Sequence, residues 1–173
     1  NGKRTTVPLT IAEDPRVNVT LADLQASLAL SQKIAPAMAA AALGYREQHA
    51  LKKLLDVRFP QARKVREEMR GYLGQLRTEP AENQPTFESV ADMLAGVERA
   101  LESADTAPTP AQRQFVDDAL AKLAAVQREW DAAKSGSLAH LNAALASAGE
   151  KPVTIPEKDK LQVEEPDEGQ DLP

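Results

Sequence analysis

Few residues of this chain have the types and the spacing that catalysis or metal binding requires. Neither of its two histidines, His49 and His140, belongs to a Glu-x-x-His or His-Glu-x-x-His motif, which would place metal ligands on one face of a helix. Each histidine is therefore interpreted as a surface or boundary residue of an amphipathic helix. Because the chain has no cysteine, it has no thiolate nucleophile, disulfide or cysteine-based metal site. The sequence predicts no metal site and no cofactor.

Carboxylate pairs occur at Glu67-Glu68 and Asp117-Asp118. Adjacent residues of a helix point about 100° apart and do not share a site, so both pairs are predicted to be solvated surface. A glycosidase needs two carboxylates held across a sugar-sized cleft, and a core of Leu and Ala offers no such cleft. The chain also lacks a glycine-rich phosphate loop and a Gly-x-Ser-x-Gly elbow. We predict no catalytic residue in this segment and interpret it as non-enzymatic.

The aromatic residues have two interpretations. Trp130, the only tryptophan, is in helical register with Val126 and Ala133, so it is either a core anchor or a ligand platform, and the spacing favours the core. The same interpretation applies to Tyr45 and Tyr72. The small side chains from Ala37 to Leu43 suit close internal packing, and the alternative is a shallow groove for a partner helix.

Composition predicts an all-α fold. Only 3% of the 173 residues are aromatic and alanine is abundant, which favours helices over a β-sandwich. Residues 150–173 hold eight acidic residues and three lysines, so this tail accounts for the whole net charge of -5. The neutral body, without a basic cluster, argues against nucleic-acid binding. No uninterrupted apolar run approaches the roughly 20 residues that cross a bilayer, so no membrane span is predicted.

The helix signals divide the chain into four helices. Thr20 with Asp23 resembles a capping box and begins the first helix, which Pro36 is expected to kink without breaking and Phe59-Pro60 to end. The second and third helices are expected from the apolar rows Ala62, Val65, Met69, Tyr72, Leu76 and Phe87, Val90, Leu94, Val97, Leu101.

The fourth helix has the clearest start and stop. Thr109-Pro110 followed by Gln112 forms a second capping box, and Gly149 with Pro152 ends the helix. Its apolar row runs in register to Ala133, then continues one position out of phase, so a kink or short break is expected at Ser135-Gly136-Ser137. The row consists of Val116, Ala119, Leu123, Val126, Trp130 and Ala133, then Leu138, Leu141 and Leu145.

Together these elements predict an antiparallel four-helix bundle over residues 20–149, with two long and two shorter helices. The first and fourth helices each span roughly 37 residues, about 55 Å at 1.5 Å per residue, so the long pair should project beyond the short pair.

Two flanking segments complete the predicted organisation. Val7, Leu9 and Ile11 alternate with polar residues as in a β-strand that has no partner here, so residues 1–19 are interpreted as the end of a preceding β-domain and a linker. Residues 150–173 form an acidic, extended tail. That tail either packs along the bundle through Val153, Ile155, Leu161 and Val163, which we favour, or pairs with the orphan strand.

Several short motifs resemble the C-terminal region of bacterial BNR-repeat proteins, which are sialidase-like or sortilin-like β-propellers. They are Ile11-Ala12-Glu13-Asp14-Pro15-Arg16-Val17, Leu21-Ala22-Asp23-Leu24-Gln25, Pro108-Thr109-Pro110-Ala111-Gln112, and the segment from Trp130 to Gly149 with Leu141-Asn142 and Leu145. The resemblance covers about residues 7–155. It implies a secreted or periplasmic protein, often described as a glycosyl hydrolase, whose catalytic residues would lie in an upstream propeller.

Three functions follow as hypotheses. The first is a non-catalytic helical module at the C-terminus of a secreted propeller protein, acting in packing or protein interaction, with the preceding β-domains, another protein or a second copy as partner. The second is a part of a glycoside hydrolase that shapes its cleft. The third is a stand-alone adaptor that binds a partner helix. Burial of Leu30, Ile34 and Leu141 would count against the adaptor's groove.

Overall fold

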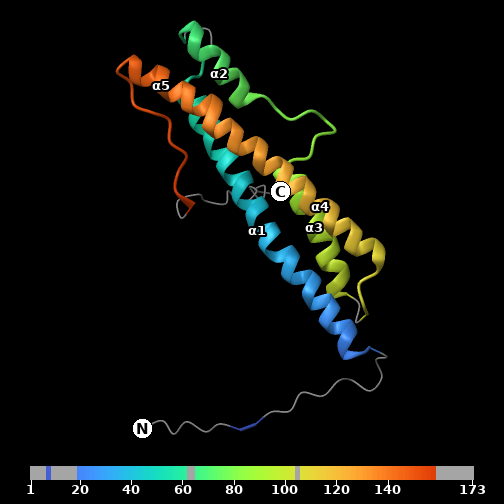
Figure 1. Cartoon of the computed structure of the whole chain (residues 1–173). Helices are drawn as coiled ribbons and strands as arrows, with labels where there is room; N and C mark the ends of the chain where they lie inside the picture. The colour runs from blue at the N-terminus through green and yellow to red at the C-terminus, as the bar shows by residue number, and fades with distance from the viewer. Residues whose placement is uncertain (1–6, 9–18, 62–64, 104–105, 159–173) are drawn as a thin grey trace, which may run out of the picture.

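The computed structural model describes residues 7–8, 19–61, 65–103 and 106–158, and within these ranges the protein is all-α (Figure 1). The predicted strand lies outside the described residues except for Val7. Two of the predicted tail anchors, Leu161 and Val163, lie outside them as well.

The first helix, α1 (Leu21–Arg58), has 38 residues and is about 57 Å long at 1.5 Å per residue. The predicted capping box is present, because the Asp23 amide donates to Thr20 Oγ1 at 3.2 Å and the Thr20 amide donates to Asp23 Oδ2 at 3.0 Å. The helix continues through Pro36 and ends before Phe59. Pro36 is exposed, so water can reach the backbone carbonyl that proline leaves without a donor.

The two short helices are α2 (Glu67–Arg77) and α3 (Phe87–Glu102). The prediction for α3 is confirmed, and all five residues of its apolar row are buried. The predicted extent of α2 is wrong at its start, because Val65 lies in a bend before the helix and Ala62 is outside the described residues. Helix α2 begins where Glu67 and Glu68 bring two carboxylates to its positive end.

The last helical track consists of α4 (Pro110–Ala133), a π-helical turn η2 (Lys134–Leu138) and α5 (Ala139–Ser147). The predicted second capping box is present, since Gln112 N–H donates to Thr109 Oγ1 at 3.2 Å. At the predicted phase change the helix does not stop but changes to π-helical geometry. The π-turn accommodates one extra residue, which brings Leu138 and Leu141 back to the buried side.

The end of α5 and the residues after it fold back on the helix. Gly149 has φ +73°, and the Glu150 amide donates to the Leu145 carbonyl at 2.9 Å, which is a glycine-dependent helix stop. Asn142 then binds both backbone groups of Val153, accepting its N–H at 2.7 Å and donating to its carbonyl at 2.9 Å. Val153 is buried, so the preferred prediction that the tail packs along the helices is confirmed for this part.

The arrangement of the helices differs from the predicted four-helix bundle. Ser27 near the start of α1 donates to the Thr106 carbonyl just before α4, and Arg58 at the end of α1 pairs with Glu150 after α5. The two long tracks therefore run parallel. Helices α2 and α3 run the opposite way, one after the other (Figure 1). The fold thus has three helical tracks, by which we mean α1, then α2 with α3, then α4 with η2 and α5, and they run up, down and up.

This arrangement follows from which helices touch. Helix α3 packs against α1 and α4, whereas α2 packs against α5, η2 and the end of α1. Each level of the molecule thus holds three helices around one core. The buried residues of that core come from every helix, namely Leu30, Ile34, Ala37, Ala41, Leu51, Leu55, Phe59, Met69, Leu73, Phe87, Val90, Leu94, Val97, Leu101, Val116, Ala119, Leu123, Val126, Trp130, Leu138, Leu141, Leu145 and Val153.

Candidate functional site

Polar contacts between the two long tracks surround Trp130, close to the level at which the middle track is interrupted. The Trp130 indole is 8% exposed and its Nε1 donates to Glu47 Oε2 at 2.7 Å. The Lys134 ammonium lies 3.4 Å from the same carboxylate oxygen and 3.0 Å from Asp131 Oδ1. We call these four residues the Trp130 cluster.

The electrostatics of the Trp130 cluster keep its lysine charged. Burial lowers the pKa of Lys134, but the carboxylates of Asp131 and Glu47 more than offset it, and the pKa is raised overall. The ammonium also lies 5.5 Å from the centre of the Trp130 ring, within the range of a cation–π contact. Such a lysine is a poor general base or nucleophile at neutral pH, because both roles need the deprotonated amine.

A hollow of about 380 Å³ opens beside the Trp130 cluster and is bordered by Ala40, Gly44 and Phe87. Gly44 lies directly beneath the Phe87 ring, and a Cβ at this position would lie 2.6 Å from Phe87 Cε2. The volume falls in the range of small-molecule sites. Its charged groups, however, already bind one another across the helices. The arrangement therefore supports α1–α4 attachment better than ligand chemistry.

A second hollow, of about 510 Å³, lies where the loop between α2 and α3 passes over α1 and α4. Tyr45 stacks on His49 at its border, with ring centres 5.9 Å apart and planes inclined by 18°. Lys52 forms an ion pair with Glu79, and this hydrogen bond is the main reason that the pKa of Lys52 is raised. Both partners are exposed, so the pair adds little to stability.

The predictions about individual residues have mixed outcomes. Trp130 is a core anchor, as predicted, and both histidines are exposed. Tyr45 is not a core anchor, because it is 43% exposed. At its level the buried row of α1 passes through Ala41 and Gly44, which leaves Tyr45 on the adjacent, solvent-facing row.

The carboxylate predictions are also confirmed, since both adjacent pairs, Glu67-Glu68 and Asp117-Asp118, are exposed. Over the described ranges, no three His, Asp or Glu side chains are placed to hold a metal ion. The contacts of Glu47 with Trp130 and of Gly44 with Phe87 were not predicted from the sequence. The signal for the second was a lone glycine in the buried row of a long, alanine-rich helix.

Comparison with known proteins adds no family. A scan against protein-family models, a search of curated proteins and a search of solved structures each returned no match. The resemblance to BNR-repeat proteins stays a prediction.

Helix α1 has one further property, which inspection of apolar runs did not predict. By length and composition it is long and apolar enough to cross a membrane, since an 18-residue window within it has a mean hydropathy of 1.2. This test is also passed by core helices of soluble proteins. Only 22% of the window is buried, so much of this apolar surface faces outward.

Proposed function

We propose that this chain is a non-catalytic helical module that acts in packing or protein interaction, and that its docking surface is the outward face of α1. The observation that carries the proposal is the exposure of an apolar, nearly uncharged helix surface. Leu21 and Leu28 are 62% and 58% exposed, and the other exposed residues of α1 as far as Ala42 are mostly alanine and glutamine.

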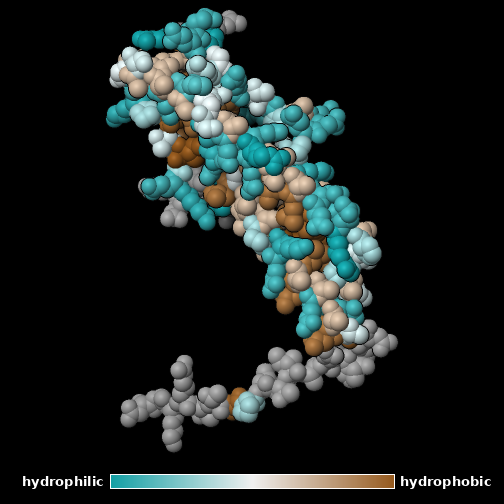
Figure 2. Space-filling model, in the orientation of Figure 1, coloured by the Kyte–Doolittle hydropathy of each residue, from teal (hydrophilic) through white to brown (hydrophobic). Residues whose placement is uncertain are grey.

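This α1 face has regular spacing. One row, at alternating steps of four and three residues, consists of exposed Leu21, Gln25, Leu28, Gln32, Ala35, Ala39 and Ala42. Such spacing presents a continuous seam to a second helix or a flat protein surface. In Figure 2, brown and pale atoms lie among teal ones along the lower part of the molecule, where the first half of α1 runs in Figure 1.

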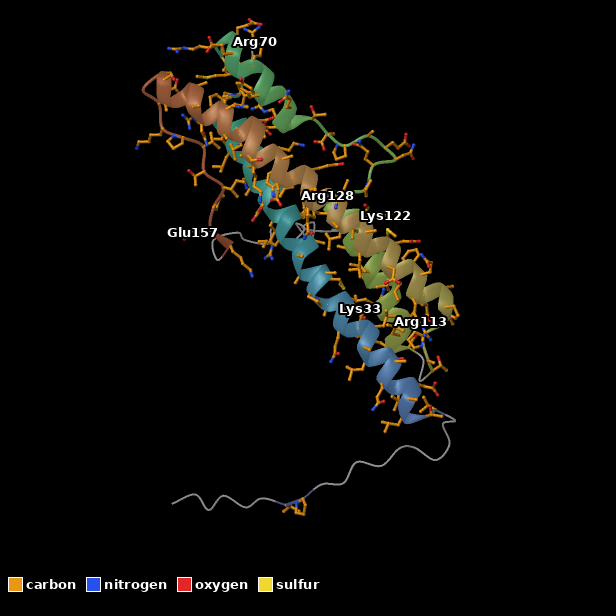
Figure 3. The ribbon with its side chains drawn as sticks, viewed as in Figure 1. Lys33, Arg70, Arg113, Lys122, Arg128 and Glu157 are labelled. Atoms are coloured by element: carbon orange, nitrogen blue, oxygen red, sulfur yellow. The ribbon has the colours of Figure 1, made fainter. Side chains whose placement is uncertain are left out.

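The charge distribution separates the α1 face from an ordinary solvated surface. From Leu21 to Tyr45 the only charged residues are Asp23 and Lys33, whereas the solvent side of α4 carries Arg113, Lys122 and Arg128 (Figure 3). Depletion of charge is typical of the centre of protein interfaces. Contiguous exposed apolar surface is a feature of interaction sites on soluble proteins.

The occupant that we propose is a β-domain preceding the module in the same polypeptide. The strand-like alternation of Val7, Leu9 and Ile11 precedes the α1 face by about ten residues, so a domain ending there would be tethered beside Leu21 at high effective concentration. The resemblance to BNR-repeat proteins supports a propeller protein that is secreted or periplasmic. In that setting any glycoside hydrolase chemistry would reside upstream.

The hypothesis of an adaptor that binds a partner helix in its own groove has less support. It required a groove through Leu30, Ile34 and Leu141, and these residues are 5%, 0% and 0% exposed. A partner helix would therefore have to use the α1 face as well.

The absence of cysteine provides a direct test. Leu28→Cys places a single thiol on the α1 face, and Phe115→Cys places a matched thiol on α4, where the native side chain is 42% exposed. Thiol labelling is measured in this chain and in a longer product of the same gene that includes the upstream residues. We expect labelling at position 28 to slow at least tenfold in the longer protein and labelling at position 115 to stay unchanged. Equal rates at position 28 in both proteins, or an upstream sequence without a β-domain, would overturn the proposal.

A further inference from the structure

Helix α2 has little stability of its own. It has 11 residues, below the roughly 12–15 at which isolated helices become marginal, and its N-cap residue, Arg66, makes no side-chain cap. Gly71 and Gly74 both lie inside it, and mid-helix glycine disfavours helix relative to alanine. A Cβ at either position would meet nothing within 4 Å. Neither glycine is therefore required by close packing.

Few side chains attach α2 to the rest of the protein. Its buried residues are Met69 and Leu73, and the Tyr72 ring lies 5.4 Å from that of His140. Ser137 in the π-turn donates to Gln75 Oε1 at 2.6 Å. Helix α3, by comparison, contributes five buried residues to the core. Within the middle track, α3 is therefore strongly attached to the core and α2 weakly.

Arg77 holds the last turn of α2 against the end of α1. Its Nη2 donates to the carbonyls of Leu55 and Phe59 at 2.6 and 3.0 Å, and its Nε lies 3.1 Å from Asp56 Oδ1. These carbonyls are at the C-terminus of α1, where the helix dipole favours a cation. Arg77 thus ties the end of α2 that leads into the loop to the C-terminus of α1.

Beneath α2 lies an apolar surface that belongs to other elements. The end of α1, the π-turn η2 and α5 contact α2, and their residues there are at most 8% exposed. The buried leucines that these three elements contribute to the core at this end are Leu51, Leu55, Leu138, Leu141 and Leu145, and we call them the α2 seat.

We propose that α2 opens and closes as a unit while α1, α3 and α4 stay folded, and that each opening exposes the α2 seat. Local opening of this kind is expected of an element with few buried contacts and low intrinsic helix stability. The contacts of Arg77 with the end of α1 must break before α2 can separate from it. The proposal is independent of the α1 face and stands whether or not that face binds a partner.

Hydrogen exchange of backbone amides tests the proposal. In the wild-type protein we expect the α2 amides to exchange much faster than those of α1, α3 and α4. Replacing glycine by alanine within α2 stabilises only the closed helix. Gly71→Ala and Gly74→Ala should each slow exchange in α2 about fivefold, and together about 25-fold. Amides of α3 that exchange only on global unfolding should slow by the same factor, because α2 is unfolded in that state as well.

Gly96→Ala in α3 is the matched control, because Gly96 is also exposed and a Cβ there would meet nothing within 4 Å. It should leave exchange in α2 unchanged. Arg77→Met, which keeps the side-chain stem and removes the guanidinium, should speed exchange in α2 at least fivefold. The proposal is overturned if Gly96→Ala slows the α2 amides as much as the α3 amides, because α2 would then open only when the whole protein unfolds. It is equally overturned if neither alanine in α2 changes the rate there.

Discussion

Replacing Gly44 by alanine is the sharpest test of how the three tracks pack. Gly44 is the one glycine of α1 and is buried beneath the Phe87 ring, which is 1% exposed. An added Cβ would meet Cε1, Cζ and Cε2 of that ring, the last at 2.6 Å. Since real Cβ atoms do not come this close to a ring carbon, either the ring or the backbone must move.

Two opposing terms decide the size of the effect. Alanine in place of a mid-helix glycine stabilises a helix by about 1 kcal/mol. Forcing an extra carbon into a packed core costs about 1–3 kcal/mol. Gly96→Ala in α3 carries the first term alone, because its Cβ would lie in open space. The two variants should therefore differ in free energy of unfolding by about 1–3 kcal/mol, with Gly44→Ala the less stable.

The assay is equilibrium unfolding in urea, followed by far-ultraviolet circular dichroism and by the fluorescence of Trp130. For a domain of this size, the difference corresponds to about 2–4 °C in Tm for each kcal/mol. In a Phe87→Leu background the difference between the two alanine variants should shrink, because the smaller side chain leaves room for the Cβ. If Gly44→Ala and Gly96→Ala stabilise the protein equally, the close approach of α1 and α3 at this level is wrong.

Three further predictions concern the Trp130 cluster and the helix caps. Trp130→Phe removes the N–H that binds the carboxylate of Glu47 and should lower the free energy of unfolding by about 1.5–3 kcal/mol in thermal unfolding followed by circular dichroism. Thr109→Ala removes the cap of α4 and should lower it by about 1 kcal/mol by the same measurement, whereas Thr109→Ser should have little effect. The hydrogen bonds from Thr20 lower the pKa of Asp23, so their stabilisation is present above the unfolded-state pKa and is lost as the pH falls through the folded-state value. An NMR titration should find this low pKa in the wild type and a higher one in Thr20→Val, which loses the hydroxyl but keeps the backbone N–H that binds Asp23.

Local features of the fold were predictable from the sequence because their signals are local. Thr20 and Thr109 begin their helices through side chains that bind the backbone three residues on, and Gly149 ends α5 through its positive φ. The one-residue phase change after Ala133 correctly located an irregular turn. Its form, a π-turn that keeps the helix continuous, depends on both halves of the track finding a partner helix.

The arrangement of the tracks was not predictable in the same way. A period of 3.6 residues shows which face of a helix is buried but not which helix covers it. The apolar rows of α2 and α3 fit two short helices placed side by side as well as two placed end to end. The same limit explains Tyr45, which is one row away from the buried side, and the Glu47–Trp130 contact, which joins residues that no local spacing relates.

The parallel course of the two long tracks has a mechanical consequence. The chain enters α1 at one end of the molecule and leaves α5 at the other, so a pull on these two points draws the tracks in opposite directions along their length (Figure 1). Such a load shears the whole shared core at once, and many contacts must break together before the tracks slide. Two helices pulled apart from the same end would instead separate one turn at a time, at much lower force. The up-down-up order therefore predicts cooperative unfolding under a load applied along the long axis of the helices.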